Sequence, residues 1–492
     1  MSKRRATMRT SHKLMLAGAL SATLLVVGCA GTRGLKPQAT LTGADSLAAG
    51  QSLGGAAVDS GAWPAQNWWS RLGDPQLDQL MTEALAGSPN LRAALARARQ
   101  ASALAEAAGS ARRPRVDSSL SATRERFPAG ALIPPPVGGT WGTFNQLQAS
   151  LSWDVDLWGK NRAAYEAAVG QARAAAVDAQ AARLTLSVDI AHAYVQLQRA
   201  FLQLDVAQAT LAQREQIYAL TRDRNAAGID SRLELKQAES ALPAAREQIV
   251  QLNETIELTR TQLAALLGQG PDRGQAIARP AAAALAEAVL PTTVPSQLLG
   301  RRPDIVAQRW RVEAARRGID VAQTQFYPDL NLAALVGFQS LGTSSFLSLG
   351  NRAVGVGPAV SLPLFDAGQR RANLASADAE YDLAVEQYNQ SLSDALREVV
   401  DQLSSFRSVA QQRVEQQQAL AASRDAYDLA VLRYREGVGN YLQVLTTETQ
   451  LLAQQSLDVD LRARTLDLSI NLVRALGGGF ENAAQPLAAL MP

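Results

Sequence analysis

Cysteine and histidine are almost absent from this sequence of 492 residues. Cys29 is the single cysteine, and His12 and His192 are the two histidines. An intrachain disulfide is therefore excluded, and so is a zinc site built from these residue types. Catalytic triads that use histidine lack the parts they need, and no cleft motif supports a hydrolase that works with carboxylates alone. We expect no enzyme, no cofactor and no metal site.

Aromatic residues are also scarce, at 5% of the chain, while alanine, leucine, glutamine and arginine are abundant. This bias favours long helices over a β-sandwich or a doubly wound sheet. The apolar content of 47% is ample for a hydrophobic core, so global disorder is excluded.

The N-terminus is typical of an export signal, predicted over residues 1–28. Five basic residues precede an apolar run, Leu14 to Val27, which is too short for a stable membrane-spanning helix. Val26-Val27-Gly28-Cys29 then resembles a bacterial lipobox, which implies acylation of Cys29. Ala30, in place of aspartate, suggests sorting to the outer membrane. The alternative is an ordinary signal with an incidental cysteine.

Removal of the signal also changes the net charge. The full chain carries +3, and the five basic residues of the signal, which has no acidic residue, account for more than that excess. The mature chain is therefore weakly acidic, at about −2, and its charge gives no reason to expect a nucleic-acid partner. Residues 29–74 are expected to form an extended N-terminal anchor segment.

An internal repeat organises the rest of the chain. Pro89-Asn90-Leu91 matches Pro303-Asp304-Ile305, and Gly228-Ile229 matches Gly437-Val438. We place the first repeat at 75–290, with a connector at its end, and the second at 291–476, followed by a C-terminal tail at 477–492. Each repeat is expected to contain a helix, two strands, a long helix, a tight turn and a return helix.

The helical segments show apolar residues at 3-4 spacing, which predicts knobs-into-holes packing between antiparallel neighbours. Gly228 and Gly437 are expected to end the long helices in the left-handed conformation. Gly159 and Gly368 mark the turns from strand to helix. The predicted helices are 159–226 and 231–267 in the first repeat, with 303–325, 367–435 and 440–476 in the second.

Four segments alternate between apolar and polar residues with period two, at about 114–126, 145–157, 328–339 and 353–364. Strands of this length, apolar on one side, are typical of a transmembrane β-barrel. The alternative is a half-buried sheet in a soluble protein. Four strands cannot close a barrel, and open sheet edges are not tolerated in lipid. Several chains must then contribute to one barrel, and periodicity does not decide whether these are two, three or four.

Several motifs, in their order along this repeat, resemble those of the TolC-type outer-membrane channels, and specifically of their NodT-like efflux lipoprotein branch. The resemblance covers the chain from Cys29 to about Gly479. The motifs are Trp68-Trp69 with Asp74-Pro75, Ser152-Trp153-Asp154-Val155-Asp156-Leu157-Trp158-Gly159, Gly300-Arg301-Arg302-Pro303-Asp304-Ile305, Phe326-Tyr327-Pro328-Asp329, and Leu362-Pro363-Leu364-Phe365-Asp366-Ala367-Gly368.

The resemblance implies a mixed α and β membrane protein. Three chains would share a twelve-stranded barrel in the outer membrane, four strands from each, continuous with a coiled-coil helical tunnel in the periplasm. It also implies a periplasmic adaptor and an inner-membrane pump of the RND type as partners. The channel would be a passive, gated exit for small molecules, with lipid on Cys29.

The resemblance places the gate at the helical tips, around 220–236 and 429–446. By position, Glu234 matches an acidic link residue and Tyr434 its tyrosine partner. Two acidic ring positions of the family fall on the neutral Gln443 and Thr446. Other charges there could form a lock: Asp230, Arg433 and Arg435. Solvated tip residues are the alternative. Gly228, Ile229, Gly437 and Val438 resemble tip motifs that adaptors contact.

Three other functions compete with efflux. The same fold could serve as the exit of a type I protein secretion system. A periplasmic coiled-coil scaffold or adaptor lipoprotein would explain the helices but not the alternating strands. A lipid-anchored enzyme lacks a recognisable site. For Arg301 and Arg302, a tie between the two halves is favoured over substrate binding.

Overall fold

The computed structural model describes residues 32, 34–43, 46–48, 50–53, 63–129, 136–281, 300–342 and 345–480. Cys29 and the export signal lie outside the described residues. The chain forms two compact units: the first contains 1–41, 99–174 and 308–388, and the second contains 42–98, 175–307 and 389–492. Each unit therefore combines segments of both repeats, and each is described by itself.

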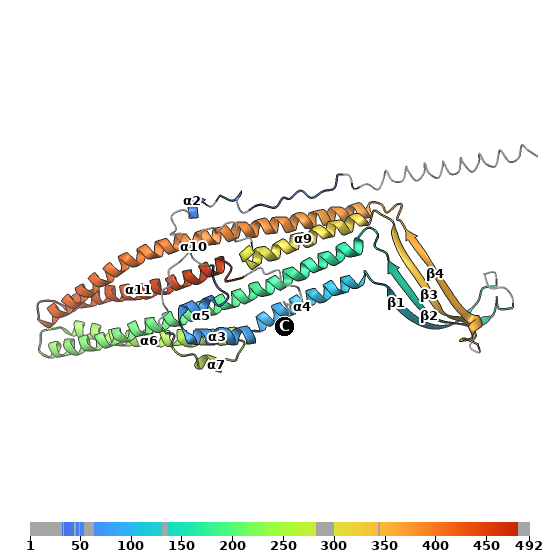
Figure 1. The fold of residues 1–492 in the computed structure, drawn as a ribbon. Coiled ribbons are helices and arrows are strands. Elements are labelled where there is room, and N and C mark those ends of the chain that lie inside the picture. Colours follow the sequence, from blue (N-terminus) through green and yellow to red (C-terminus); the bar gives the residue numbers. More distant parts are fainter. Residues whose placement is uncertain are drawn as a thin grey trace, which may run out of the picture. The chain divides into compact units, whose positions relative to one another are not determined.

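The helices and strands follow one another in the order that the repeat predicts (Figure 1). In chain order they are α2 (Gly50–Leu53), the 3₁₀ turn η2 (Trp68–Leu72), α3 (Pro75–Gly87), α4 (Pro89–Ser110), β1 (Arg115–Arg126), β2 (Trp141–Asp154), α5 (Lys160–Ala226), α6 (Arg232–Leu266), α7 (Asp272–Gln275), α9 (Pro303–Thr324), β3 (Asp329–Leu341), η3 (Leu349–Asn351), β4 (Arg352–Ser361), α10 (Gln369–Arg435) and α11 (Tyr441–Ala475).

Corresponding helices of the two repeats have equal lengths. Helices α4 and α9 each have 22 residues, α5 and α10 each have 67, and α6 and α11 each have 35. At 1.5 Å per residue the two long helices each span about 100 Å. Among the described helices, none combines the length and the apolarity that a membrane span requires.

The first unit contains one antiparallel sheet with the strand order β1-β2-β3-β4. Because directly paired residues share a face, the register separates the side chains into two sets. One face is apolar and exposed, with Val354 and Val356 at 71% and 88% exposure. Its other members include Val116, Leu120, Leu147, Leu151, Leu332, Val336 and Val360. The opposite face is polar, with Ser119, Ser121, Gln146, Gln148, Ser150, Asn331 and Gln339.

Two strands differ in extent from the sequence expectation. Strand β2 spans 141–154 rather than 145–157, because Trp141 and its neighbours continue the ladder opposite the end of β1. The chain leaves the sheet before 157 because Asp156 has a φ of 53° and turns toward α5. Strand β4 ends at Ser361 instead of 364, just before Pro363, which has no N–H to donate to a ladder.

The turns from strand to helix contain Gly159 and Gly368, with φ of 76° and 91°. Beside Gly159, the carboxylate of Asp156 accepts hydrogen bonds from the backbone N–H groups of Asn161 and Arg162, at 2.8 and 2.9 Å. Asp366 does the same before α10, where its carboxylate accepts from the backbone N–H groups of Gly368 at 3.1 Å and Arg370 at 3.2 Å. Each aspartate thereby satisfies the free donors of a helix N-terminus.

In the second unit, the largest core joins α3 and η2 to α5, α6 and α11. Trp68 and Trp69 are buried in it, as packing residues. Asp74 caps α3 and also accepts a hydrogen bond of 2.5 Å from the hydroxyl of Tyr194 on α5. The N-terminal part of the second unit is thereby fixed to a long helix.

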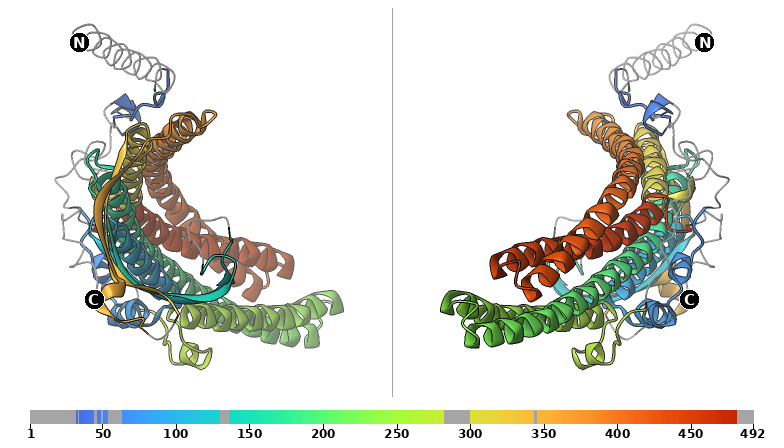
Figure 2. Two further views of the ribbon diagram at one scale, coloured as in Figure 1. Left: turned by 90° about the vertical axis from the view of Figure 1, so that its right-hand side faces the viewer. Right: turned by 90° about the vertical axis from the view of Figure 1, so that its left-hand side faces the viewer.

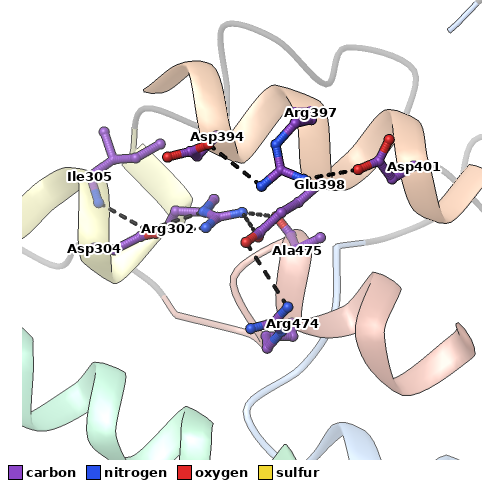
Figure 3. A network of polar contacts seen from close by, with 9 residues as sticks. All are labelled: Arg302, Asp304, Ile305, Asp394, Arg397, Glu398, Asp401, Arg474 and Ala475. Atoms are coloured by element: carbon purple, nitrogen blue, oxygen red, sulfur yellow. Dashed lines mark hydrogen bonds and ion pairs between the residues drawn. The ribbon is translucent and has the colours of Figure 1, made fainter. Parts of the chain in front are cut away.

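Arg302 ties three helices together within the second unit (Figure 3). Its guanidinium lies between Asp304 at the start of α9, at 2.6 Å, and Glu398 of α10, at 2.8 Å. It also donates to the carbonyl of Ala475, the last residue of α11, at 3.2 Å. The Arg302 side chain is only 8% exposed. The geometry therefore gives this arginine a structural task.

Candidate functional site: the helical tips

Two tight turns connect the long helices to their return helices, in the second unit. Gly228 and Gly437 adopt φ of 74° and 79°, as a left-handed cap requires, and glycine does so without steric cost. Ser231 and Asn440 then cap α6 and α11 through their side chains. Figure 2 shows the α5–α6 hairpin in green beside the α10–α11 hairpin in orange and red.

A polar cluster joins these two hairpins. The guanidinium of Arg224, near the end of α5, donates to the carboxylate of Asp230 at 2.9 Å and to the carbonyl of Tyr434 at 3.0 Å. The hydroxyl of Tyr434, in α10, donates to the same carboxylate at 2.5 Å. That hydroxyl also shares a hydrogen bond of 2.8 Å with Thr221. One carboxylate thus accepts from both hairpins.

Burial makes these contacts stronger than surface ion pairs. Tyr434 is fully buried, and the Arg224 and Asp230 side chains are 11% and 10% exposed. The Arg224 guanidinium also lies 4.6 Å from the centre of the Tyr434 ring, at a distance for a cation–π contact. Burial, and then the hydrogen bond to Asp230, raises the pKa of Tyr434 to about 12. Its hydroxyl therefore keeps the proton that it donates.

A second ion pair, this one between the hairpins, involves Arg214, which precedes Arg224 on α5 and lies farther from the tip. Arg214 donates to Glu448 of α11 at 2.8 Å and to the carbonyl of Ala241 in α6 at 3.1 Å. Both charged side chains are mostly buried, at 17% and 8% exposure. The tip region therefore contains two buried ion pairs, and Arg214 reaches from the first hairpin to the second.

Tyr434 bonds to Asp230, and not to Glu234 as the family pattern suggested. Glu234 accepts instead from the backbone N–H of Ser231 at 2.9 Å, in a capping box at the start of α6. The hydrogen bond from the Ser231 hydroxyl is the main reason why the pKa of Glu234 is lowered. Three residues after the N-cap, its carboxylate serves its own helix.

The remaining predicted gate residues do not join the cluster. Arg433 is exposed and donates to the carbonyl of Val438, at 3.4 Å. Arg435 is exposed. Gln443 and Thr446 are exposed on the first turns of α11, and the Thr446 hydroxyl bonds the carbonyl of its own helix four residues earlier. These residues therefore lie on the surface of the isolated chain.

Arg224 and Thr221 also belong to the cluster. They lie inside the predicted range 220–236, but no motif singles them out. Each lies near the end of α5, where a basic or polar residue is ordinary. The spacing does contain one usable signal. Arg224 and Asp230 lie six residues apart across a glycine turn, an arrangement that brings a carboxylate back to the helix that it follows.

The outer surface of the tips is apolar at four positions. Ile229 and Leu233 of the first hairpin are 62% and 65% exposed, and Val438 and Leu442 of the second are 67% and 62% exposed. The corresponding positions of the two repeats therefore present the same kind of surface. Nowhere in the described part of the chain do three or more metal-ligating side chains gather.

Comparisons with known proteins agree with this architecture. The model of the outer membrane efflux protein family matches residues 80–269 and 294–478. The fusaric acid resistance protein FusA of Burkholderia cepacia is 42% identical over 363 residues, 73% of this chain and 68% of that protein. The pyoverdine export outer membrane protein OpmQ of Pseudomonas putida is 33% identical, over 85% of this chain and 89% of that protein.

Among solved structures, the outer membrane protein VceC of Vibrio cholerae superposes with a TM-score of 0.80 at 38% identity. The match covers 85% of this chain and 100% of that chain. Sequence and fold thus point the same way over both repeats. The chain belongs to the outer membrane efflux protein family and is an outer-membrane efflux channel.

Proposed function

We propose that three copies of this chain form one channel, with a twelve-stranded barrel in the outer membrane and a helical tunnel in the periplasm. The channel is a passive, gated exit in a tripartite system. An inner-membrane pump of the RND type supplies energy, and a periplasmic adaptor connects the pump to the channel. Small molecules are the clients.

The sheet is the observation that carries this proposal. One face is apolar over all four strands, and its apolar side chains are exposed on β1 and β4, as a lipid-facing surface requires. Strands β1 and β4 each pair on one side only, among the described residues. Free strand edges are not tolerated in hydrocarbon, so other copies of the sheet must close them.

The protein mass of the particle tests the assembly. We expect detergent-extracted protein to have the mass of about three chains, measured by light scattering with the bound detergent subtracted. A folded monomer would leave the edges of β1 and β4 open and would contradict the shared barrel. A different whole number of chains would keep the barrel and correct its size.

The names of the relatives support small molecules as clients. FusA confers resistance to fusaric acid, OpmQ exports pyoverdine, and the multidrug resistance protein MdtP of Escherichia coli is 29% identical over 96% of this chain. These names favour efflux over the alternative of protein secretion. The exposed apolar pairs at the tips, Ile229 with Leu233 and Val438 with Leu442, are the proposed adaptor contacts.

The tip cluster is the proposed gate. Two hydrogen bonds cross between the hairpins, from the Tyr434 hydroxyl to Asp230 and from Arg224 to the Tyr434 carbonyl, so separating the hairpins must break both. The Arg224–Asp230 ion pair lies within the first hairpin and holds both groups in place. The cluster therefore favours the arrangement in which the hairpins lie together.

Cys29 is the proposed lipid attachment site. Cys29→Ser is expected to abolish acylation and leave the trimer intact, because the barrel itself holds the protein in the membrane. Mass spectrometry of the N-terminal peptide and the particle mass measure these two results separately. Ala30→Ser is the control that keeps the cysteine. A peptide mass that differs between Cys29→Ser and the wild type by the side-chain substitution alone would exclude lipid at this position.

A further inference from the structure

His192 lies on α5 and faces α11, in the second unit. Its Nδ1 is 2.7 Å from a carboxylate oxygen of Asp467, and its Nε2 is 3.2 Å from the side-chain oxygen of Asn471. The side chains of His192 and Asp467 are 29% and 24% exposed. The imidazole thus connects the long helix of the first repeat to the return helix of the second.

The partners of the two ring nitrogens are both acceptors. The carboxylate of Asp467 has no proton to donate as an ionised group, and its other oxygen accepts from the amide of Gln196 at 3.2 Å. Nε2 likewise faces the carbonyl oxygen of Asn471, not its NH₂ group. A neutral imidazole has one donor, whereas the imidazolium has two. With these two acceptors in place, the imidazolium makes both hydrogen bonds and the neutral ring makes one.

The charges around His192 also favour its protonated form. Burial disfavours the cation, but the hydrogen bond and the charge of Asp467, helped by Asn471 and Asp189, raise the pKa of His192 above its ordinary value. Asp189, on the same helix, also faces Arg474 of α11, and burial raises the pKa of this carboxyl against both cations. Arg474 lies 4.0 Å from Glu398 of α10.

Other polar contacts follow along the same pair of helices. Arg199 donates to Asp460 at 2.8 Å, Gln203 bonds the same carboxylate at 3.1 Å, and Arg214 pairs with Glu448. Arginine, aspartate and glutamate ordinarily change charge well outside pH 5 to 8, whereas histidine changes charge within this range. Among these contacts, His192 alone can respond to a moderate change of pH.

We infer that His192 is a pH-dependent tie between the two repeats, which holds α5 to α11 as an imidazolium and loosens when it loses its proton. Because the pKa is higher in the folded chain, the tie contributes fully below the unfolded value near 6.5. Its contribution is lost as the pH rises through the folded value. The α5–α11 contact is accordingly strongest in acid. This inference concerns one chain and does not depend on the number of chains in the channel.

The titration of His192 can be followed without assigning signals among several histidines. His12 lies in the predicted export signal, so the processed chain contains one histidine. We expect protein labelled with ¹³C-histidine, in detergent, to show a single ring signal that titrates above pH 6.5. Asn471→Leu removes the acceptor for Nε2 and is expected to lower that midpoint. A wild-type midpoint at or below 6.5 would overturn the assignment of an imidazolium.

Thermal unfolding of the full protein tests the effect on the fold. The midpoint of the wild type is expected to fall between pH 6 and pH 8 by about 1–2 °C more than that of His192→Gln. Arg199→Gln is the matched control, because it removes an ion pair on the same helix pair and leaves His192 unchanged. It should lower the midpoint equally at both values. An equal pH dependence in the wild type and His192→Gln would overturn the inference.

Discussion

Asp230→Asn is expected to produce a channel that opens far more readily than the wild type. The substitution keeps the size of the side chain but removes the charge that Arg224 and Tyr434 share. Hydrogen bonds to charged groups contribute about 2 kcal/mol each. Loss of that amount from the arrangement with joined hairpins changes its ratio to the open form by about 30-fold.

Single-channel recording in planar bilayers measures this effect. The open fraction should rise strongly in both Asp230→Asn and Tyr434→Phe, because Tyr434→Phe removes the hydroxyl that reaches from the second hairpin to Asp230. The ion pair of Arg224 lies within the first hairpin and does not oppose separation of the two. Glu234→Gln is the matched control. It changes a carboxylate four residues away that serves only the cap of α6, so its recordings should equal those of the wild type. Wild-type recordings from Asp230→Asn would exclude the cluster as the gate.

Arg302→Met is expected to destabilise the folded chain more than any other substitution proposed here. Methionine fills part of the space, but the carbonyl of Ala475 loses the Arg302 donor. Glu398 loses its contact of 2.8 Å, and among the described residues its remaining ion pair is with Arg474, at 4.0 Å. Breaking a buried ion pair by removing one partner costs about 3 kcal/mol. The junction of α9, α10 and α11 should therefore loosen before the rest of the unit.

Thermal unfolding of the purified channel measures this loss, which we expect to lower the midpoint by about 5 °C. Arg302→Lys keeps the charge but cannot bond Asp304 and Glu398 as a planar fork, so it should fall between the wild type and Arg302→Met. Arg301→Gln is the neighbouring control. The Arg301 guanidinium lies over the ring of Trp63, 5.0 Å from its centre, and does not take part in the contacts of Arg302. A wild-type midpoint in Arg302→Met would show that the network is dispensable.

The sequence predicted the elements because their patterns are local. A helix of 67 residues repeats its apolar spacing many times, and Gly228 and Gly437 mark where such helices end. The ends of the strands were less predictable. Strand β2 stops at Asp154 because Asp156 takes a left-handed conformation to cap α5. Residues 155–157 can either continue the strand pairing or form the cap of α5. Three-dimensional packing decides between the two, and the local sequence pattern does not.

The tip cluster was predictable only in part. The family resemblance indicates both Tyr434 and Asp230, but as members of separate contacts, and it pairs Tyr434 with Glu234. The capping box of Ser231 withdraws Glu234 from that contact. Arg224 completes the cluster from a position where its residue type is unremarkable. Which of several nearby charges pair depends on side-chain directions that spacing alone does not define.

The equal lengths of corresponding helices limit how such a protein can change in size. One inserted residue would rotate every following side chain of a helix by about 100° and would move its apolar stripe off its neighbour. Seven residues, two turns of helix, would nearly restore the direction. Lengthening therefore has to come in heptads, in a long helix and its returning partner together, and in both repeats. Single-residue variation is confined to the loops between strands, where the two repeats already differ.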